Sequence, residues 1–120
     1  EIVVTSNLFG DILTDLGAAI AGGMGLAAGA NLNPEREFPS MFEPIHGSAP
    51  DIAGQGKANP LATVWSASQM LDFFGYRQWG ERLIDIIEEI LKEKKVLTPD
   101  LDGTATTSQV GDEVISKLRQ

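Results

Sequence analysis

The stretch "FEPIHGSAPDIAGQGKANP" (residues 42–60) is the part of this sequence from which its fold can be inferred. It holds the chain's one histidine, together with three glycines, three prolines and two acidic residues, and it has no apolar run longer than two residues. A loop of this length is uncommon in a compact domain unless it has a function. We therefore expect a structured loop that binds a ligand.

The composition restricts what that ligand can be. The 120 residues suit one domain, or part of one, and carry a net charge of −8 with a pI of about 4.4. Such an acidic surface repels nucleic acids and anionic membranes, so we expect neither as a partner. A small anionic ligand would need a bound metal or a cluster of backbone N–H groups. The absence of cysteine excludes a disulfide framework and a thiolate zinc site. No stretch resembles a signal peptide or a membrane span, and we expect a cytoplasmic protein.

Working outward from the loop, the apolar pattern predicts helices joined by few strands. A buried strand is predicted at Ile2–Val4 and a short extended segment at 41–45. Helices are predicted after a cap at Ser6 or Asn7, from Asn59-Pro60 to Gly75, over 78–95, and from about Thr107.

The predicted core faces of these helices come from residues at helical spacing. They are Leu8, Ile12, Leu16, Ala19 and Ile20 in the first helix, Leu61, Val64, Trp65 and Leu71 in the second, Trp79, Leu83, Ile86, Ile87 and Ile90 in the third, and Val110, Val114 and Leu118 in the last. Three or four helices with so little strand favour the back half of an α/β protein. A strand at the very start suggests a piece of a longer chain; the alternative is a complete domain that has been trimmed.

Two aspartates lie one turn apart in the first predicted helix. Asp11 and Asp15 are at positions i and i+4, which places both carboxylates on one helix face. Like charges at this spacing destabilise an isolated helix, whereas a bound Mg²⁺ or Mn²⁺ would reverse that effect. A solvated acidic face is the alternative, and two carboxylates do not complete a six-fold coordination sphere. The residues alone leave both hypotheses open.

The loop itself offers groups suited to a nucleotide. Small residues after His46, namely Gly47, Ser48 and Ala49, would let backbone N–H groups point at a phosphate. Asp51 could accept hydrogen bonds from a ribose diol, Ile52 could cover a base, and Asn59 could pair with a purine edge. No G-x-G-x-x-G motif follows a strand, so this is not a Rossmann fingerprint. The alternative is an internally bonded loop in which Asn59 is only a helix cap.

Taken together, the two motifs resemble a known enzyme family. "NLFGDILTD" followed by residues 42–60 resembles the C-terminal part of the β-decarboxylating dehydrogenases, and the resemblance extends over the whole chain. This family includes isocitrate, isopropylmalate, homoisocitrate, tartrate and D-malate dehydrogenases. The connecting segment "GANLNPEREFPSMFEP" is most similar to the tartrate/D-malate branch.

The resemblance implies roles for individual residues. Asp11 and Asp15 would bind Mn²⁺ or Mg²⁺, which would hold the hydroxyl and carboxylate of a 2-hydroxy acid. Residues 46–59 would bind NAD, with its phosphates near Gly47, Ser48 and Ala49 and its adenosine near Asp51, Ile52 and Asn59. His46 would belong to the same loop, and Glu43 and Asn7 would lie toward the nicotinamide. The implied reaction is hydride transfer to NAD followed by loss of CO₂.

The resemblance also implies what this chain lacks. In the family, the substrate-binding arginines, a catalytic tyrosine, a lysine and a third metal-binding aspartate precede this stretch, the last two contributed by the partner subunit of a homodimer. We therefore expect no catalytic residue among these 120 and no turnover by the chain alone. Residues 1–22 would end the middle domain of the two-domain α/β fold, and residues 23–120 would belong to the NAD domain. A non-catalytic nucleotide-binding or assembly module is the rival hypothesis, and the substrate could also be isopropylmalate or isocitrate.

Overall fold

The structure, a computed structural model, describes residues 2–120, and Glu1 lies outside the described residues. Four helices, one strand pair and three short 3-10 turns (η) follow one another along the described chain. In order they are α1 (Asn7–Ile20), η1 (Met24–Leu26), β1 (Ala28–Asn31), β2 (Met41–Pro44), η2 (Pro50–Ile52), α2 (Leu61–Phe73), α3 (Arg77–Glu93), η3 (Pro99–Leu101) and α4 (Thr107–Leu118).

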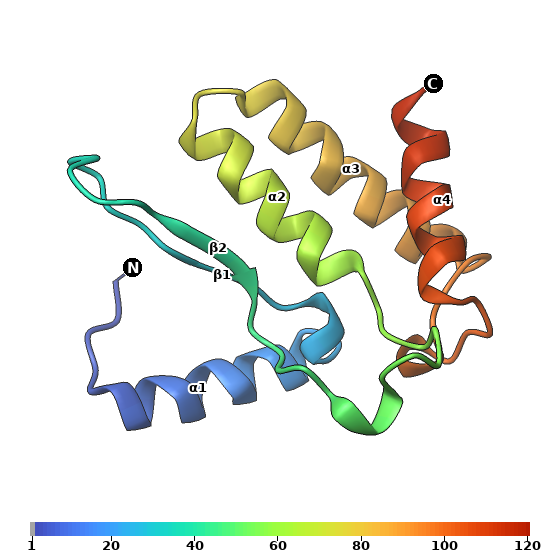
Figure 1. The fold of residues 1–120 in the computed structure, drawn as a ribbon, viewed down its shortest axis with the longest axis horizontal. Coiled ribbons are helices and arrows are strands. Elements are labelled where there is room, and N and C mark those ends of the chain that lie inside the picture. Colours follow the sequence, from blue (N-terminus) through green and yellow to red (C-terminus); the bar gives the residue numbers. More distant parts are fainter. Residues whose placement is uncertain (1) are drawn as a thin grey trace.

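Helix α2 is at the centre of the arrangement. It packs against α3 on one side and against both strands on the other, while α4 packs on α3 (Figure 1). The strands form an antiparallel pair in which Ala28 faces Pro44 and Asn31 faces Met41. Helix α1 lies apart from the helical layers and contacts the remainder of the chain mainly through η1.

One apolar core joins α2, α3 and α4. Its buried members are Leu61, Ile86, Ile87, Ile90, Leu97, Val110 and Val114. Removing a side chain of this kind from water stabilises the fold by roughly 1.5–3 kcal/mol. The predicted stripe on α3 is therefore confirmed for Leu83, Ile86, Ile87 and Ile90. It is wrong for Trp79, which lies in the first turn of α3 and is 58% exposed.

The helix ends agree with the local signals in the sequence. Gly75 has a φ of +87°, and it follows α2 where the chain must reverse. The N–H groups of Gly75 and Tyr76 donate to the carbonyls of Asp72 and Leu71, at 2.9 and 2.8 Å, which satisfies the end of the helix. At the start of α4, Thr106 and Gln109 form a reciprocal capping box, so the predicted start near Thr107 is confirmed.

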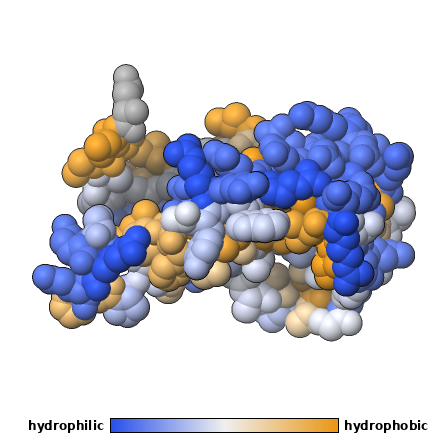
Figure 2. Space-filling model, turned by 90° about the horizontal axis from the view of Figure 1, so that it is seen from above, coloured by the Kyte–Doolittle hydropathy of each residue, from blue (hydrophilic) through white to orange (hydrophobic). Residues whose placement is uncertain are grey.

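The predictions for the N-terminal segment are wrong in this structure. Residues 2–4 are not assigned to a strand, and Ile2, Val3 and Val4 are exposed rather than buried. A strand requires a neighbour to accept its backbone hydrogen bonds, and within residues 2–120 no segment pairs with this one. The apolar positions predicted for α1 are also exposed; only Ala18 is buried. Figure 2 shows the resulting apolar surface next to the N-terminal end, in contrast to the hydrophilic side formed by the C-terminal helices.

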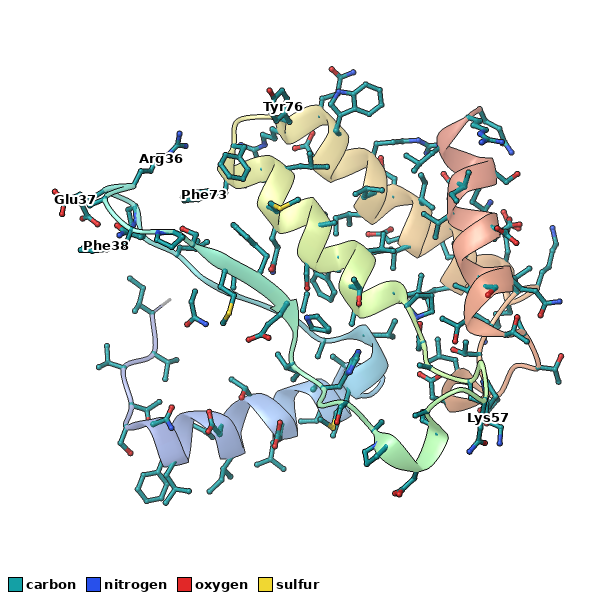
Figure 3. All side chains as sticks on the ribbon, viewed as in Figure 1. Arg36, Glu37, Phe38, Lys57, Phe73 and Tyr76 are labelled. Carbon is teal, nitrogen blue, oxygen red and sulfur yellow. The ribbon has the colours of Figure 1, made fainter. Side chains whose placement is uncertain are left out.

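Several predicted core positions outside α1 are also only partly covered. Trp65 remains 40% exposed and Leu118 39% exposed, so neither belongs to the buried core. The turn between the strands is held to α2 by one side chain. The guanidinium of Arg36 lies 5.0 Å from the ring centre of Phe73 and donates to the Phe73 carbonyl at 2.8 Å (Figure 3).

In the described part of the chain, no helix is long and apolar enough to cross a membrane.

A network of charged side chains holds α4 on α3. The ammonium of Lys117, whose side chain is 9% exposed, lies 2.7 Å from a carboxylate oxygen of Glu93 and 3.3 Å from one of Glu89. Arg82 joins the network by donating to Glu89 and to the backbone carbonyl of Lys117. The hydrogen bonds from Lys117 lower the pKa of both carboxyl groups, and its hydrogen bond to Glu93 raises the pKa of Lys117. Each charge therefore favours the folded state.

We expect this network to set an acid limit on stability. Because the pKa values of Glu89 and Glu93 lie below their ordinary 4.5, their contribution is complete above about pH 4.5 and is lost as the pH falls through the folded values. The contribution of Lys117 is complete below its ordinary 10.5 and is lost as the pH rises through its raised pKa. Urea unfolding across a pH series should show the acid slope, and Lys117→Gln should flatten it. The control Lys92→Gln, which breaks the exposed pair with Glu88, should keep the slope. Equal slopes in wild type and Lys117→Gln would contradict this assignment.

Candidate functional site

The loop between β2 and α2 folds around a pocket of about 620 Å³. The lining residues are mostly small or apolar, with a few polar side chains among them. From the loop come His46, Gly47, Ser48, Ala49, Ile52, Ala53, Gly54, Gly56, Lys57, Ala58 and Asn59, and from elsewhere come Met24, Gly25, Asp100 and Thr107. Six of the nine residues predicted to bind the cofactor therefore lie around one cavity: His46, Gly47, Ser48, Ala49, Ile52 and Asn59.

The first wall of the pocket is a tight turn after β2. The N–H of Ile45 still pairs with the carbonyl of Ala27 at 3.1 Å, and the chain then leaves the strand pair. Nδ1 of His46 lies 3.0 Å from the carbonyl oxygen of Gly47. Ala49 has a φ of +43°, a conformation that costs a non-glycine residue roughly 1 kcal/mol and that occurs preferentially at functional sites. The Gly47–Ala49 turn is thus held in a specific shape next to the cavity.

Asn59 closes the loop at its other end. Its side chain is buried; Oδ1 accepts from the N–H of Leu61 at 3.0 Å, and Nδ2 donates to Oδ2 of Asp100 at 3.0 Å. The first bond caps the N–H of Leu61, the first residue of α2, and Pro60 lies directly before the helix. The second connects the loop to η3. Both the oxygen and the nitrogen of the Asn59 side-chain amide therefore have a partner within the chain, in addition to any contact with a ligand.

Helix α4 fixes the segment between Gly56 and Asn59. The N–H of Thr107 donates to the Gly56 carbonyl at 2.8 Å, and the Thr107 hydroxyl donates to the carbonyl of Ala58. These bonds hold the carbonyl groups of the two residues on either side of Lys57. Figure 3 shows Lys57 at this junction of the loop with the turn that precedes α4.

Several lining residues were not found from the sequence. Lys57 lies inside the quoted stretch, and its charge in an acidic chain was a signal that could have identified it. Asp100 and Thr107 contact the loop across 41 and 49 residues of sequence, and no local pattern predicts such contacts. Position 25 has no room for a side chain, because a Cβ on Gly25 would lie 2.5 Å from Oδ2 of Asp100 and 3.0 Å from Cβ of Asn59.

The remaining predicted site residues lie outside the pocket lining. Asp51 is exposed on η2, and its backbone carbonyl accepts from Nε2 of Gln55 at 2.7 Å. Glu43 is exposed on β2, and Asn7 is exposed at the start of α1. The structure therefore does not bring these three side chains together with the loop residues that surround the cavity.

The aspartate pair lies on α1, as its spacing predicted. Asp11 and Asp15 are both exposed, and among residues 2–120 there is no group of three or more His, Cys, Asp or Glu side chains suited to hold a metal ion. The two carboxylates are suitable oxygen donors for Mg²⁺ or Mn²⁺, but they supply only part of a coordination sphere. Further ligands would have to come from water, substrate or another chain segment.

The hydrogen bond between Asn59 and Asp100 can be tested by exchanging the amide and the carboxylate between the two positions. Asn59→Asp should destabilise the chain by about 1–3 kcal/mol, because the new carboxylate would face that of Asp100 and the hydrogen bond would be lost. Adding Asp100→Asn should recover most of that loss, because an amide donor would again face a carboxylate while the cap on α2 is kept. The free energy of unfolding of the four proteins in this cycle is the measurement. If the double variant were no more stable than Asn59→Asp, the contact would not matter for stability.

Comparison with known proteins agrees with these motifs. Residues 1–114 match the isocitrate/isopropylmalate dehydrogenase family. Over its full length the chain is 49% identical to a probable tartrate dehydrogenase/decarboxylase of Bacillus subtilis and 52% identical to a 3-isopropylmalate dehydrogenase of Thermobifida fusca, of which it covers 34% and 33%. Over 95% of its length it is 53% identical to the decarboxylating D-malate dehydrogenase of Escherichia coli, covering 33% of it.

The solved structures lead to the same family. The isocitrate dehydrogenase of Methylococcus capsulatus is similar with a TM-score of 0.91 and 41% identity, over 98% of this chain and 34% of that one. The fold is thus part of the α/β isocitrate dehydrogenase-like fold, as predicted, and the chain spans about a third of the length of the relatives it matches. From the match over residues 1–114, the chain belongs to the isocitrate/isopropylmalate dehydrogenase family.

Proposed function

We propose that this chain is the C-terminal third of an NAD- and divalent-metal-dependent enzyme that oxidises and decarboxylates a 2-hydroxy dicarboxylic acid such as tartrate or D-malate. The observation that carries the proposal is the pocket enclosed by residues 46–59. Its volume of about 620 Å³ falls within the usual range for cofactor sites, and its lining is mainly apolar with a few polar groups, as such sites require. The relatives named for tartrate and D-malate support the reaction class.

The pocket suits a dinucleotide at two kinds of surface. In the Gly47–Ala49 turn no bulky side chain separates the backbone from a phosphate, so N–H groups there can approach its oxygens. Ile52 offers an apolar surface for the adenine, and the free lone pair and second amide hydrogen of Asn59 can bind its edge. His46 borders the same cavity. Asp51 would bind the adenosine ribose from the mouth of the pocket, and Glu43 and Asn7 would lie toward the nicotinamide.

Asp11 and Asp15 would hold the divalent ion, Mn²⁺ or Mg²⁺. When bound, this ion would supply a Lewis acid for the hydroxyl and carboxylate oxygens of the substrate. The contribution of the chain itself is to position two carboxylates one helical turn apart, where their mutual repulsion favours cation binding. Groups that move protons would come from the remainder of the enzyme.

The proposal extends to organisation and location. Residues 1–22 would end a middle domain, and residues 23–120 would complete the NAD domain; the small contact between α1 and the other elements supports this division. A homodimer or a higher homo-oligomer in the cytoplasm would be the working form. The similar identities to tartrate and isopropylmalate relatives leave isopropylmalate and isocitrate as alternative substrates. A non-catalytic nucleotide-binding module is the second candidate, favoured by a cavity that the chain forms by itself.

The metal assignment is tested in the full-length protein that carries this chain. With tartrate or D-malate and NAD, Asp11→Asn should lower kcat by at least about tenfold and raise the Mn²⁺ concentration for half-maximal rate, because a ligand and a charge are lost. Asp112→Asn, the same change on the exposed side of α4, should leave both values unchanged. If the wild-type protein turned over none of tartrate, D-malate, isopropylmalate and isocitrate, the non-catalytic module would be favoured. An unchanged Mn²⁺ requirement in Asp11→Asn would make the pair a solvated acidic face.

The cofactor assignment is tested by the choice between NAD and NADP. A carboxylate at position 51 can bond a ribose 2′-hydroxyl but repels a 2′-phosphate, so it favours NAD over NADP. Asp51→Lys combined with Ile52→Tyr should lower kcat/KM for NAD and raise it for NADP, with most of the change caused by Asp51. Because Asp51 is exposed, added salt should relieve part of the rejection of NADP by wild type. Asp102→Lys is the control for an added positive charge outside the pocket. An unchanged NAD/NADP ratio in the double variant would remove Asp51 and Ile52 from the adenosine site.

A further inference from the structure

We infer that Lys57 is a phosphate-binding residue of this pocket, directed at the diphosphate that NAD and NADP have in common; this rests on the proposed function. No motif in the sequence assigns a role to this residue. The first reason is its place in the lining. Of the side chains that border the pocket in the described chain, only Lys57 carries a full positive charge at neutral pH.

The second reason is its electrostatic setting. The chain has a net charge of −8, so an anionic ligand approaches against a repulsive field unless a local positive charge offsets it. The carboxylate of Asp100 borders the same pocket, although its Oδ2 accepts from Asn59. Within residues 2–120, the ion pairs involve other lysines and arginines, and Lys57 takes part in none of them. Its ammonium therefore remains available to a ligand.

The third reason is that its backbone is fixed. Thr107 donates hydrogen bonds to the carbonyls of Gly56 and Ala58. The side chain of Asn59 is hydrogen-bonded to the N–H of Leu61 and to the carboxylate of Asp100. The stem of Lys57 thus starts from a defined point in the pocket lining, to which the Gly47–Ala49 turn also belongs. A diphosphate held by backbone N–H groups of that turn would receive a charged donor from Lys57. An ammonium on a flexible stem suits this task, since it acts on phosphate as a point charge.

This role differs from that of Asp51 in what it predicts. A residue that selects between NAD and NADP acts at the 2′-position, so its removal changes the ratio of the two affinities. A residue that binds the shared diphosphate affects both cofactors alike. It also affects ADP but not adenosine, which carries no phosphate. The contribution should fall with added salt, because Lys57 is exposed at the rim.

The experiment measures dissociation constants in the full-length protein by calorimetry, with NAD, NADP, ADP and adenosine as ligands at low and high salt. Lys57→Gln should weaken NAD, NADP and ADP by a similar factor of about ten at low salt and less at high salt, and should leave adenosine unchanged. Lys57→Arg, which keeps the charge, should retain most of the affinity. Lys94→Gln, at the C-terminal end of α3, is the matched control and should change nothing.

The outcomes distinguish a failure of the role of Lys57 from a failure of the proposed cofactor site. If wild type binds none of the three phosphate-bearing ligands, the proposed cofactor site fails. If wild type binds them and Lys57→Gln binds them equally well, only the role of Lys57 fails. A loss of adenosine affinity in Lys57→Gln would also overturn the inference, because it would mean that Lys57 maintains the shape of the pocket. A changed NAD/NADP ratio would place its ammonium at the 2′-position instead.

Discussion

The pocket depends on the two hydrogen bonds of one buried amide, that of Asn59. Through Oδ1 it starts α2, which carries the central core, and through Nδ2 it holds η3 against the loop. An amide is suited to this position because it offers a donor and an acceptor at once, whereas a carboxylate would offer only acceptors. The end of the loop is therefore fixed in position by the same residue that begins the helix beneath it. A long loop anchored in this way can enclose a cavity without a covering layer of its own.

The chain divides into a part that can bury its apolar residues and a part that cannot. Helices α2, α3 and α4 enclose a shared core, whereas α1 and the segment before it expose theirs. The relatives are about three times as long as this chain. A full-length protein of that kind has residues outside this stretch that are available to cover α1, which gives a physical reason for the exposure. The exposure of the apolar stripe on α1 therefore does not argue against the helix.

Local signals in the sequence predicted helix ends well and long-range contacts poorly. Asn59-Pro60, Gly75 and Thr107 mark boundaries because capping and turn chemistry act over a few residues. The stripe of α3 was recognisable because its period matches the helix. The strand at Ile2–Val4 was predicted wrongly because a strand depends on a neighbour that periodicity does not supply. Loop residues such as Gly47 and Ile52 were predicted as a group from one contiguous motif. Asp100 and Thr107 were missed because only the folded chain brings them to the loop.

The two proposed binding features are connected through a single short turn. Met24 and Gly25 of η1 line the pocket, and η1 is also the main contact of α1, which carries Asp11 and Asp15. Gly25 allows this turn to lie close to Asn59 and Asp100, since a side chain there would collide with both. The wall of the pocket and the end of α1 are therefore joined by a few residues of the chain. Because α1 has few other contacts within the described chain, the described residues alone do not fix its position relative to the pocket. The geometry between the proposed metal site on α1 and the proposed cofactor site therefore depends on contacts that α1 makes outside this stretch.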